Sequence, residues 1–576
     1  MQRSPDPATV RAVLAAALLA LPMAPAAAGH GGLFRGPGGP TPSALPPPGN
    51  PNAPGVPPGL QPRPEITSVP GSAPSLVYSE ERWEFWWEFN HDAWLNLRPS
   101  LRSAVAGGST FDPPDAGTRG QVLLPALVEL MRDRDEQVRS AAVHSLARLE
   151  DASALPYLSN AAVGDASLAV RTNALIALGL AKIPKATERL KVTFHDEHVS
   201  DEMRAFAAVA LGVSSLPDAS AVLRDALAGG FESRLPTPVR AASIYALGLT
   251  QDPGNAPFLR ALAQTRGLDD TARALVIESL GRVGDRAANP IVLAALASPH
   301  SQVRRSAAVA LGVVARPEDT DVLRALERAA ENDSDGVVRS FAEISLGRIA
   351  SFGAPAVVDR LRSRLKSSTA RQRGFVALAL GISGYEAALP DLLAQFRGEA
   401  STSMRGALAI AIALLDQKEA ARELRAAFRQ EKDPYLRGHL AFALGRLGDR
   451  ESVPELREIV ASEKDPQLIY WSAIALGLLG DRTAPALLAD LYRKGGGQIL
   501  RSSWLHALGR IGDRADAAFL IEVASRGDET DLVRAFAASS LGLLCDENGV
   551  VRSALFSRDH NYTLNLTFVP ELYYLF

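Results

Sequence analysis

Hydrophobic positions along most of this chain follow the spacing of an α-helix, and the same apolar phrase returns about every 33 residues. Each unit has two apolar helical stretches joined by a short polar turn; in the first unit these are residues 122–132, 133–137 and 138–149. Such units cannot bury their apolar faces alone, so they stack on one another. The pattern predicts an all-α fold, an α-solenoid of about 13 helical hairpins over residues 121–545. We expect an open, curved rod whose terminal repeats need covering.

An arginine marks the second helix of nearly every unit, eight residues before a closing glycine or alanine. Ile469 replaces it in one of the 13 units. The other twelve units carry Arg139, Arg171, Arg204, Arg240, Arg273, Arg304, Arg339, Arg373, Arg405, Arg437, Arg501 and Arg534. The closing Leu-Gly pair lets the next helix approach closely, because glycine has no side chain. Recurrence in nearly every unit favours a structural role for this motif.

The repeated phrase resembles HEAT repeats, and more closely the short bacterial form called phycobilisome-lyase (PBS-lyase) HEAT-like, with its V-R-x-x-A-x-x-A-L-G-x-[IL]-G-D pattern. The best copies are residues 436–449, 500–513 and 271–285. The resemblance covers residues 121–545 and implies an α-solenoid, a fold that serves many unrelated functions.

The resemblance also implies a role for the arginines, since HEAT-like proteins use arginine–acid pairs as an internal ladder between turns. An acidic residue stands six positions before the arginine in six units: Asp133, Asp165, Asp333, Glu399, Glu431 and Asp528. We expect a structural ladder of partly exposed pairs, each worth at most about 1 kcal/mol. The alternative is a row of arginines that binds anionic ligands.

One face of the second helices varies between units and is a candidate contact surface. Positions two, five and nine residues after the arginine share this face. They include Tyr245, His439, Trp471 and His506, with Glu278 also among the fifth positions and Arg282 and Arg510 among the ninth. Recognition of a partner protein is expected where repeats differ, although variable packing explains the same pattern.

The N-terminal residues have the pattern of an export signal. Arg3 and Arg11 precede an apolar run at residues 12–21, and small residues at 26–28 form a cleavage site. We expect a signal peptide over residues 1–28 and an exported protein, periplasmic or extracellular and soluble. An Ala/Pro-rich leader is the alternative. Residues 29–78 are rich in Pro and Gly, which predicts a disordered tether.

Residues 79–120 contain a tryptophan-rich helix followed by a linker. Trp83, Trp86 and Trp87 share one helical face and Trp94 follows them. We interpret this helix as a cap over the first repeat; the alternative is an exposed aromatic platform for a protein partner or a glycan. Residues 546–576 form an aromatic tail that is expected to cover the last repeat.

Composition excludes several classes of function. The 576 residues carry a net charge of −3, so no basic field indicates nucleic-acid binding. A single cysteine, Cys545, excludes an internal disulfide or a cysteine-based zinc site. No later stretch approaches the roughly 20 apolar residues of a membrane-spanning helix, so no membrane insertion is expected.

We find no catalytic or cofactor-binding constellation in the sequence. His195 and His198 are weak candidates for metal ligands in a polar turn. Deoxyhypusine hydroxylases and phycobilin lyases have similar repeats, which makes a lyase or an iron hydroxylase the alternative function. The hydroxylases depend on paired His-Glu dipeptides, and this sequence has none. The sequence therefore favours a non-enzymatic, exported scaffold that binds other proteins.

Overall fold

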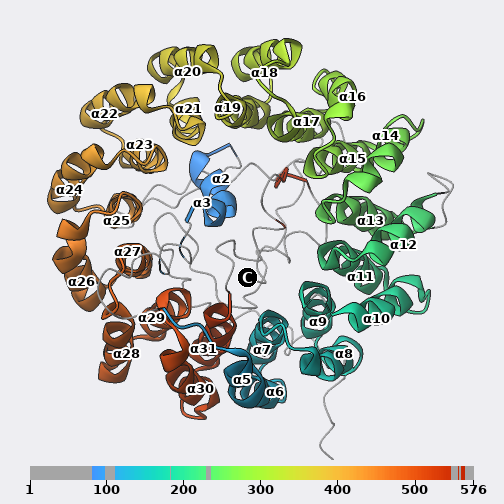
Figure 1. The fold of residues 1–576 in the computed structure, drawn as a ribbon, viewed down its shortest axis with the longest axis vertical. Helices are drawn as coiled ribbons and strands as arrows, with labels where there is room; N and C mark the ends of the chain where they lie inside the picture. The colour runs from blue at the N-terminus through green and yellow to red at the C-terminus, as the bar shows by residue number, and fades with distance from the viewer. Residues whose placement is uncertain are drawn as a thin grey trace, which may run out of the picture.

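The computed structural model describes residues 81–95, 97, 101, 111–181, 183–228, 235–546, 556 and 560–564. The predicted signal peptide and the tether lie outside the described residues. Every regular element within the described ranges is a helix or helical turn, and 13 helical hairpins form one closed ring (Figure 1). The all-α prediction and the repeat count are confirmed.

The second helices of the hairpins form the inner wall of the ring. They are α7 (Glu136–Arg148), α9 (Leu168–Leu180), α11 (Asp201–Ser214), α13 (Thr237–Leu249), α15 (Asp270–Arg282), α17 (Ser301–Val314), α19 (Gly336–Ala350), α21 (Ala370–Ser383), α23 (Thr402–Leu414), α25 (Pro434–Arg446), α27 (Pro466–Leu478), α29 (Gln498–Ile511) and α31 (Asp531–Leu544).

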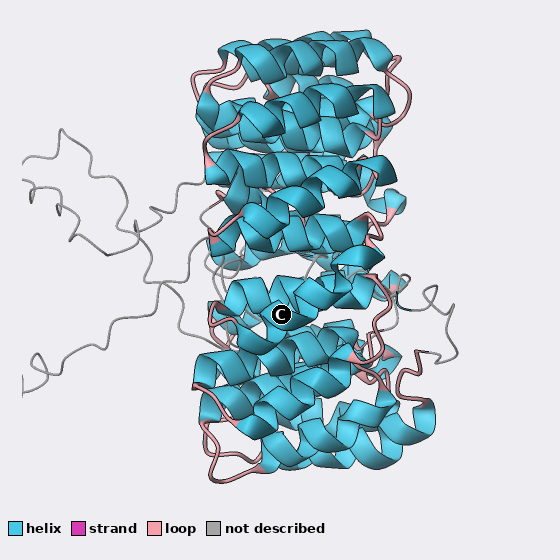
Figure 2. Cartoon of the chain, turned by 90° about the vertical axis from the view of Figure 1, so that its left-hand side faces the viewer, coloured by secondary structure: helices cyan, strands magenta, loops and turns pink. Residues whose placement is uncertain are grey.

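The first helices form the outer wall. They are α6 (Leu124–Leu130), α8 (Leu155–Gly164), α10 (Pro184–His195), α12 (Pro217–Leu227), α14 (Ala256–Ala263), α16 (Asn289–Ala295), α18 (Thr320–Asn332), α20 (Pro355–Ser367), α22 (Leu389–Gly398), α24 (Ala421–Gln430), α26 (Val453–Ser462), α28 (Ala484–Lys494) and α30 (Ala517–Ser525). Short helical turns lead into α6 and several other outer helices: η1 (Arg119–Leu123), η2 (Ala152–Ala154), η4 (Pro253–Asn255), η5 (Arg286–Ala288), η6 (Glu386–Ala388), η7 (Lys418–Ala420), η8 (Arg450–Ser452) and η9 (Arg514–Asp516). Figure 2 shows that helices run across the thickness of the ring.

Local sequence explains where these helices begin and how closely they pack. Asp135, Asp433 and Asp465 accept backbone N–H groups at the starts of α7, α25 and α27. The closing glycines sit against the next inner helix; a Cβ on Gly281, for example, would lie 2.7 Å from the Cβ of Ala310. The predicted close approach is confirmed, and larger residues at these positions would push neighbouring repeats apart.

The first and last repeats pack directly on each other. At this seam α31 packs against α7 as consecutive inner helices do elsewhere in the ring. A Cβ on Gly542 would lie 2.6 Å from Ser145 Oγ, and Ser145 Oγ donates a 2.7 Å hydrogen bond to the Ala538 carbonyl. The expected open rod is therefore wrong: each end of the array covers the apolar face of the other.

Seven of the twelve repeated arginines pair with an acidic residue of the following repeat. The pairs are Arg139–Asp165, Arg304–Asp333, Arg373–Glu399, Arg405–Glu431, Arg437–Glu463, Arg501–Glu529 and, across the seam, Arg534–Asp133. Arg171 and Arg339 instead donate to the carbonyl oxygens of Asp165 and Asp333 in their own turns. The ladder therefore joins some neighbouring repeats but not all of them, and one of its pairs crosses the seam.

Two details of the predicted ladder differ in the structure. Asp528 pairs with Arg526, and the neighbouring Glu529 takes the ladder position. Ile469 replaces the arginine where the following repeat has Gly495 at the acidic position, so an arginine there would meet no carboxylate.

Candidate functional site on the inner wall

The tryptophan-rich segment lies inside the ring and not over the first repeat. It contains α2 (Trp83–Asn90) and α3 (Asp92–Leu95), with α5 (Ala116–Thr118) leading into the first repeat (Figure 1). The predicted cap is wrong, because the last repeat already covers the first one. The inner wall instead provides the apolar surface that this helix needs.

Aromatic contacts hold α2 on the inner wall. Trp83 Nε1 donates a 3.2 Å hydrogen bond to Ser403 Oγ, and its ring centroid lies 5.5 Å from that of His439. The Trp87 ring meets Phe442 edge-on at 5.4 Å. Trp83 and Trp87 are 4% and 1% exposed. Because such rings bury large apolar areas, they dominate the docking of this helix.

Two glycines make room for Trp83, and a third at the same position of the next repeat packs against Trp471 of the inner wall. Gly374, Gly406 and Gly438 each follow the repeated arginine, in three consecutive inner helices. A Cβ on Gly374 would lie 2.5 Å from Trp83 Cδ1, and one on Gly406 would lie 3.4 Å from Trp83 Cη2. A glycine inside a helix costs about 1 kcal/mol relative to alanine. We call these residues the glycine trough; their shared register was a signal that our sequence reasoning missed.

Charged groups fix the two ends of the segment. Glu81 pairs with Arg371 at one end, and Asp92 pairs with Arg510 at the other, with an Oδ1–Nη2 distance of 2.6 Å. Burial opposes ionisation of Asp92, but the Arg510 guanidinium outweighs it and holds the pKa of Asp92 below its usual value. The pair therefore stays charged at neutral pH and sets the position of α2 along the wall.

A short C-terminal segment binds the opposite part of the inner wall. His560 Nδ1 lies 2.6 Å from Glu278 Oε1, and the Asn561 N–H donates to Glu278 Oε2 at 3.1 Å. The Phe556 carbonyl accepts hydrogen bonds from Tyr245 and Arg282. Burial opposes ionisation of Glu278, but His560 and Arg282 together lower its pKa.

The side chain of Asn561 extends this polar network. It donates to the Gln302 carbonyl and side-chain oxygens at 3.2 Å and to Ser306 Oγ at 3.1 Å. Thr563 Oγ1 donates to Gln302 Oε1 at 3.0 Å. The predicted cover over the last repeat is therefore wrong for this segment, which binds α13, α15 and α17.

The two docked segments meet inside the ring. The rings of Phe85 and Tyr562 lie 5.0 Å apart, and Tyr562 also meets Phe341. A gap of only about 10 Å³ remains where Trp86, Asn90 and His560 come together. The described parts of both segments are thus packed together as well as against the wall.

The structure places the predicted contact residues on this wall. Tyr245, His439 and Trp471 are buried, and His506 and Trp94 are half-buried. The structure brings Tyr245 to His560 and Trp471 to His91. The variable face of the second helices therefore contacts segments of the same chain. An exposed aromatic platform for a glycan is wrong for Trp83, Trp86 and Trp87, because their rings are buried.

Burial keeps the histidines of the inner wall neutral. It lowers the pKa of His144 and His506 to about 3 and that of His439 to about 4, with nearby arginines adding to the effect at His144 and His506. At neutral pH these rings act as aromatic packing groups. His506, for example, stacks on Tyr470 with a centroid distance of 4.9 Å.

His195 and His198 lie away from the inner wall. His195 ends α10, His198 follows in the turn, and both are exposed. Within the described ranges no three His, Cys, Asp or Glu residues gather as metal ligands. The same part of the chain contains no helix long and apolar enough to cross a membrane.

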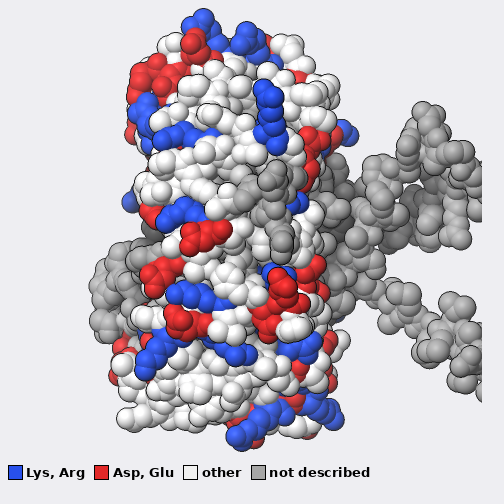
Figure 3. Space-filling view, turned by 90° about the vertical axis from the view of Figure 1, so that its right-hand side faces the viewer, with Lys and Arg blue, Asp and Glu red and all other residues white. Residues whose placement is uncertain are grey.

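The outer wall differs around its circumference. Ion pairs join the outer part of consecutive repeats along much of the ring, as in Arg260–Asp285, Arg362–Asp391, Arg397–Glu423, Arg429–Glu455 and Arg457–Asp481. By contrast, α8 contains no charged residue. Five of the six large exposed apolar side chains of the described residues belong to the first three repeats: Val122, Tyr157, Val163, Leu168 at the start of α9, and Val192; the sixth is Phe352. We call these five residues the outer patch. Figure 3, which views the right-hand side of the ring in Figure 1, shows a broad uncharged area at its lower end.

These features define a closed α-solenoid ring. A family model of HEAT repeats matches residues 123–201, 265–347, 325–413 and 421–509, which together are more than half of the chain. The chain belongs to the HEAT-repeat family. A search of curated proteins finds no match.

Several solved structures are similar. Human deoxyhypusine hydroxylase, solved in complex with glycerol, has 19% identity and a TM-score of 0.22, over 46% of this chain and 96% of its own. The Escherichia coli protein YibA has 19% identity and a TM-score of 0.32, over 50% of this chain and 98% of its own. The CpcE–CpcF complex of phycocyanin lyase from a Nostoc species has 20% identity and a TM-score of 0.26, over 51% of this chain and 94% of its own. This similarity concerns the helical-repeat fold alone.

Proposed function

We propose that this ring is a non-enzymatic, exported scaffold that binds a protein partner through the outer patch. The supporting observation is that, among the residues that the structure describes, five of the six large exposed apolar side chains lie between residues 122 and 192. Exposed apolar residues concentrated on one surface are typical of interaction sites. Because α8 carries no charge, the fitting partner is a folded protein that presents apolar side chains rather than a charged peptide.

The inner wall and the repeated motif support a scaffold role. Seven of the repeated arginines pair with the following repeat, and closing glycines such as Gly281 pack against the next inner helix, so these positions serve the fold. The contact residues of the inner wall are occupied by α2 and the C-terminal segment. The outer wall is therefore the surface that we propose for a partner.

Site-specific cross-linking tests the partner surface. A photoreactive residue in place of Tyr157 is expected to give one discrete adduct in cells, identifiable by mass spectrometry, that Val163→Ser and Val192→Ser together abolish. The matched control places the same residue at Glu458, which is exposed on the charged outer wall. Identical adducts from both positions, or none from Tyr157, would overturn the proposal. An adduct of twice the chain's mass would assign the outer patch to self-association.

Export is tested by the N-terminus of the mature protein. If the arginine-flanked apolar run directs export, protein from the cell envelope or medium begins at Gly29. A protein that stays in the cytoplasm and retains residues 1–28 would contradict export without affecting the scaffold proposal.

A further inference from the structure

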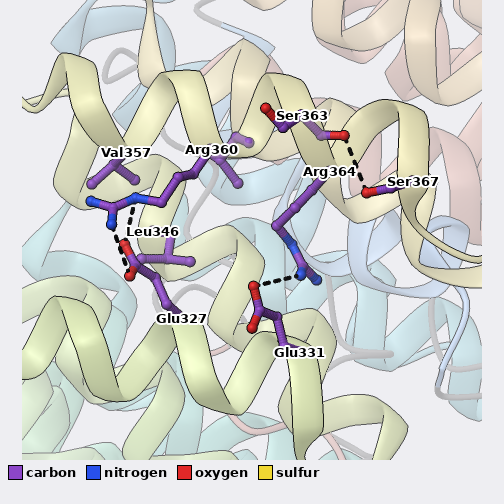
Figure 4. Close-up of a pocket in the computed structure, with 9 residues that line it drawn as sticks. Glu327, Glu331, Leu346, Val357, Arg360, Ser363, Arg364 and Ser367 are labelled. Carbon is purple, nitrogen blue, oxygen red and sulfur yellow. Dashed lines mark hydrogen bonds and ion pairs between the residues drawn. The ribbon is translucent and has the colours of Figure 1, made fainter.

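Many basic side chains of the outer wall lie within helices and are held by carboxylates. Figure 4 shows two examples between α18 and α20. Arg360 Nε lies 2.9 Å from Glu327 Oε1, and Arg364 Nη1 lies 3.5 Å from Glu331 Oε1. Peptide bonds inside such helices are poor protease substrates, because proteases cut exposed loops or locally unfolded chain. Lys494, by contrast, is the last residue of α28, and three glycines follow it.

In five repeats an acidic residue ties the turn between the two helices of the hairpin. Its carboxylate accepts the backbone N–H of the residue two positions later, at 2.8–3.0 Å. The same carboxylate pairs with the repeated arginine of a neighbouring repeat. These residues are Asp133, Asp165, Asp333, Glu399 and Glu431. Each of these turns is therefore fixed both to itself and to the repeat beside it.

The turn after α28 has neither tie. Gly495 stands at the acidic position, and Ile469 replaces the arginine that would reach it. The N–H groups of Gly496 and Gly497 donate to no carbonyl oxygen of the described residues. Residues 493–498 are all exposed. Because glycine gains the most conformational freedom when a segment opens, this turn opens at a lower cost than the tied turns.

Two other turns in which a glycine follows a basic residue are anchored by a buried side chain. In the turn at residues 264–269, Leu268 is 8% exposed and packs in the core. In the turn at residues 526–530, Glu529 is 9% exposed and accepts a 2.5 Å hydrogen bond from the Tyr492 hydroxyl. The turn at residues 495–497 contains glycine alone and has no such anchor.

We propose that the Lys494–Gly495 peptide bond is a processing site for an endoprotease that recognises basic side chains. Hydrolysis adds one water molecule across this bond and leaves a carboxylate on Lys494 and an amino group on Gly495. Arg493 and Lys494 are exposed, so an enzyme with an acidic specificity pocket can reach them. Helix ends fray, and fraying of the last turn of α28 extends the chain on the other side of the bond.

The closed ring holds the two products of this cut together. The C-terminal product packs through α29 on α27 and through α31 on α7. At the seam its Arg534 pairs with Asp133. Inside the ring its Arg510 pairs with Asp92 at 2.6 Å. Since the product is bound on both sides, we expect the cut protein to remain one ring made of two chains.

Limited digestion of the full chain with trypsin tests the site. Mass spectrometry is expected to find a product that begins at Gly495 before any other cut within the described ranges. Lys432 and Lys464 are internal controls, because they are exposed in the corresponding turns of the two preceding repeats. Lys494→Gln with Arg493→Gln is expected to abolish the cut. An earlier cut in any other described turn would overturn the inference.

Gly497→Pro tests whether the freedom of the turn controls cleavage. Gly497 has a φ of −63° and a ψ of 152°, which proline adopts, and no atom lies within 4 Å of an added Cβ. Because proline restricts the open chain, we expect cleavage after Lys494 to be about two- to fivefold slower. Peptides spanning residues 488–502, with and without the proline, are the control and are expected to be cut equally fast. An unchanged rate in the ring would contradict a role for the turn.

Native mass spectrometry of the cut protein tests whether the ring survives. We expect one particle that contains both chains, and release of the product that begins at Gly495 would contradict a two-chain ring. Protein isolated from cells is expected to include chains that begin at Gly495. If every cellular fraction is uncut after Lys494, the bond is not a processing site. Neither result changes the cross-linking expected at the outer patch, so the two proposals fail separately.

Discussion

The two segments inside the ring bind the same kind of wall by different chemistry. The α2 helix binds through tryptophan rings over the glycine trough, whereas the C-terminal segment binds through hydrogen bonds to Glu278, Gln302 and Ser306. Both surfaces use the same positions of the repeat. Trp87 meets Phe442, and His560 meets Glu278, each five residues after the repeated arginine.

This comparison shows how one repeat framework acquires specificity. The arginine and closing glycine fix the helices, while positions one, two, five and nine after the arginine decide what the inner wall binds. Docking through aromatic rings is stabilised by the burial of a large apolar area, so it tolerates little change in the volume of the packed side chains. Docking through hydrogen bonds contributes less net stability, but removal of one partner is costly because it leaves a buried polar group unsatisfied.

The largest expected effect is on the aromatic side. Trp87→Ala removes a ring that is 1% exposed and packs on Phe442. We expect a loss of about 3–5 kcal/mol in the stability of the docked helix, because burial is lost and a cavity remains. Hydrogen exchange of α2 and chemical unfolding measure it. Phe352→Ala, at a 56% exposed ring, is the control and is expected to stay within about 0.5 kcal/mol; equal effects would contradict aromatic docking.

A substitution in the glycine trough is expected to have a smaller effect on stability. Its sign is opposite to the change in helix propensity. Gly374→Ala favours the isolated helix by about 1 kcal/mol, yet its Cβ would lie 2.5 Å from Trp83 Cδ1. We expect net destabilisation of about 1–3 kcal/mol from overpacking, seen as faster hydrogen exchange in α2.

Gly398→Ala is the matched control for this trough variant. No atom lies within 4 Å of its added Cβ at the end of α22. It is expected to be neutral or slightly stabilising. A stabilising Gly374→Ala would show that Trp83 does not need the trough.

The smallest effect is expected on the polar side and depends on pH. Glu278→Gln keeps a side chain of similar shape but removes the charge that His560 and Arg282 face. We expect the free energy of unfolding at pH 7 to fall by about 1–2 kcal/mol. Because the folded pKa of Glu278 is lowered, its contribution is present above the unfolded pKa and disappears as the pH falls.

Unfolding at two pH values tests this sign. The difference between the unaltered protein and Glu278→Gln is expected to shrink below about pH 4.3, the ordinary pKa of glutamate. Glu458→Gln, at an exposed residue, serves as the control with no such difference. If the difference in unfolding free energy between the two proteins instead grew at acidic pH, the carboxylate of Glu278 would not stabilise the docked segment.

The sequence alone determined the repeat. The arginine-to-glycine spacing gave the number of hairpins, and the 3.6-residue period identified the helices, because both are local properties of each unit. It also placed Tyr245, Glu278, Arg282 and His439 on one variable face. The shared register of Gly374, Gly406 and Gly438 is also present in the sequence, but its role was missed, because only the docked Trp83 shows what Gly374 and Gly406 make room for.

Only the tertiary structure decided that the ring closes and what fills it. Closure depends on small rotations between repeats summing to a full turn, and no single repeat contains that sum. It gives Asp133 a partner in Arg534 at the other end of the array and removes the need for caps. The tryptophan helix, which any apolar surface could have covered, then binds where Gly374 and Gly406 leave room for Trp83.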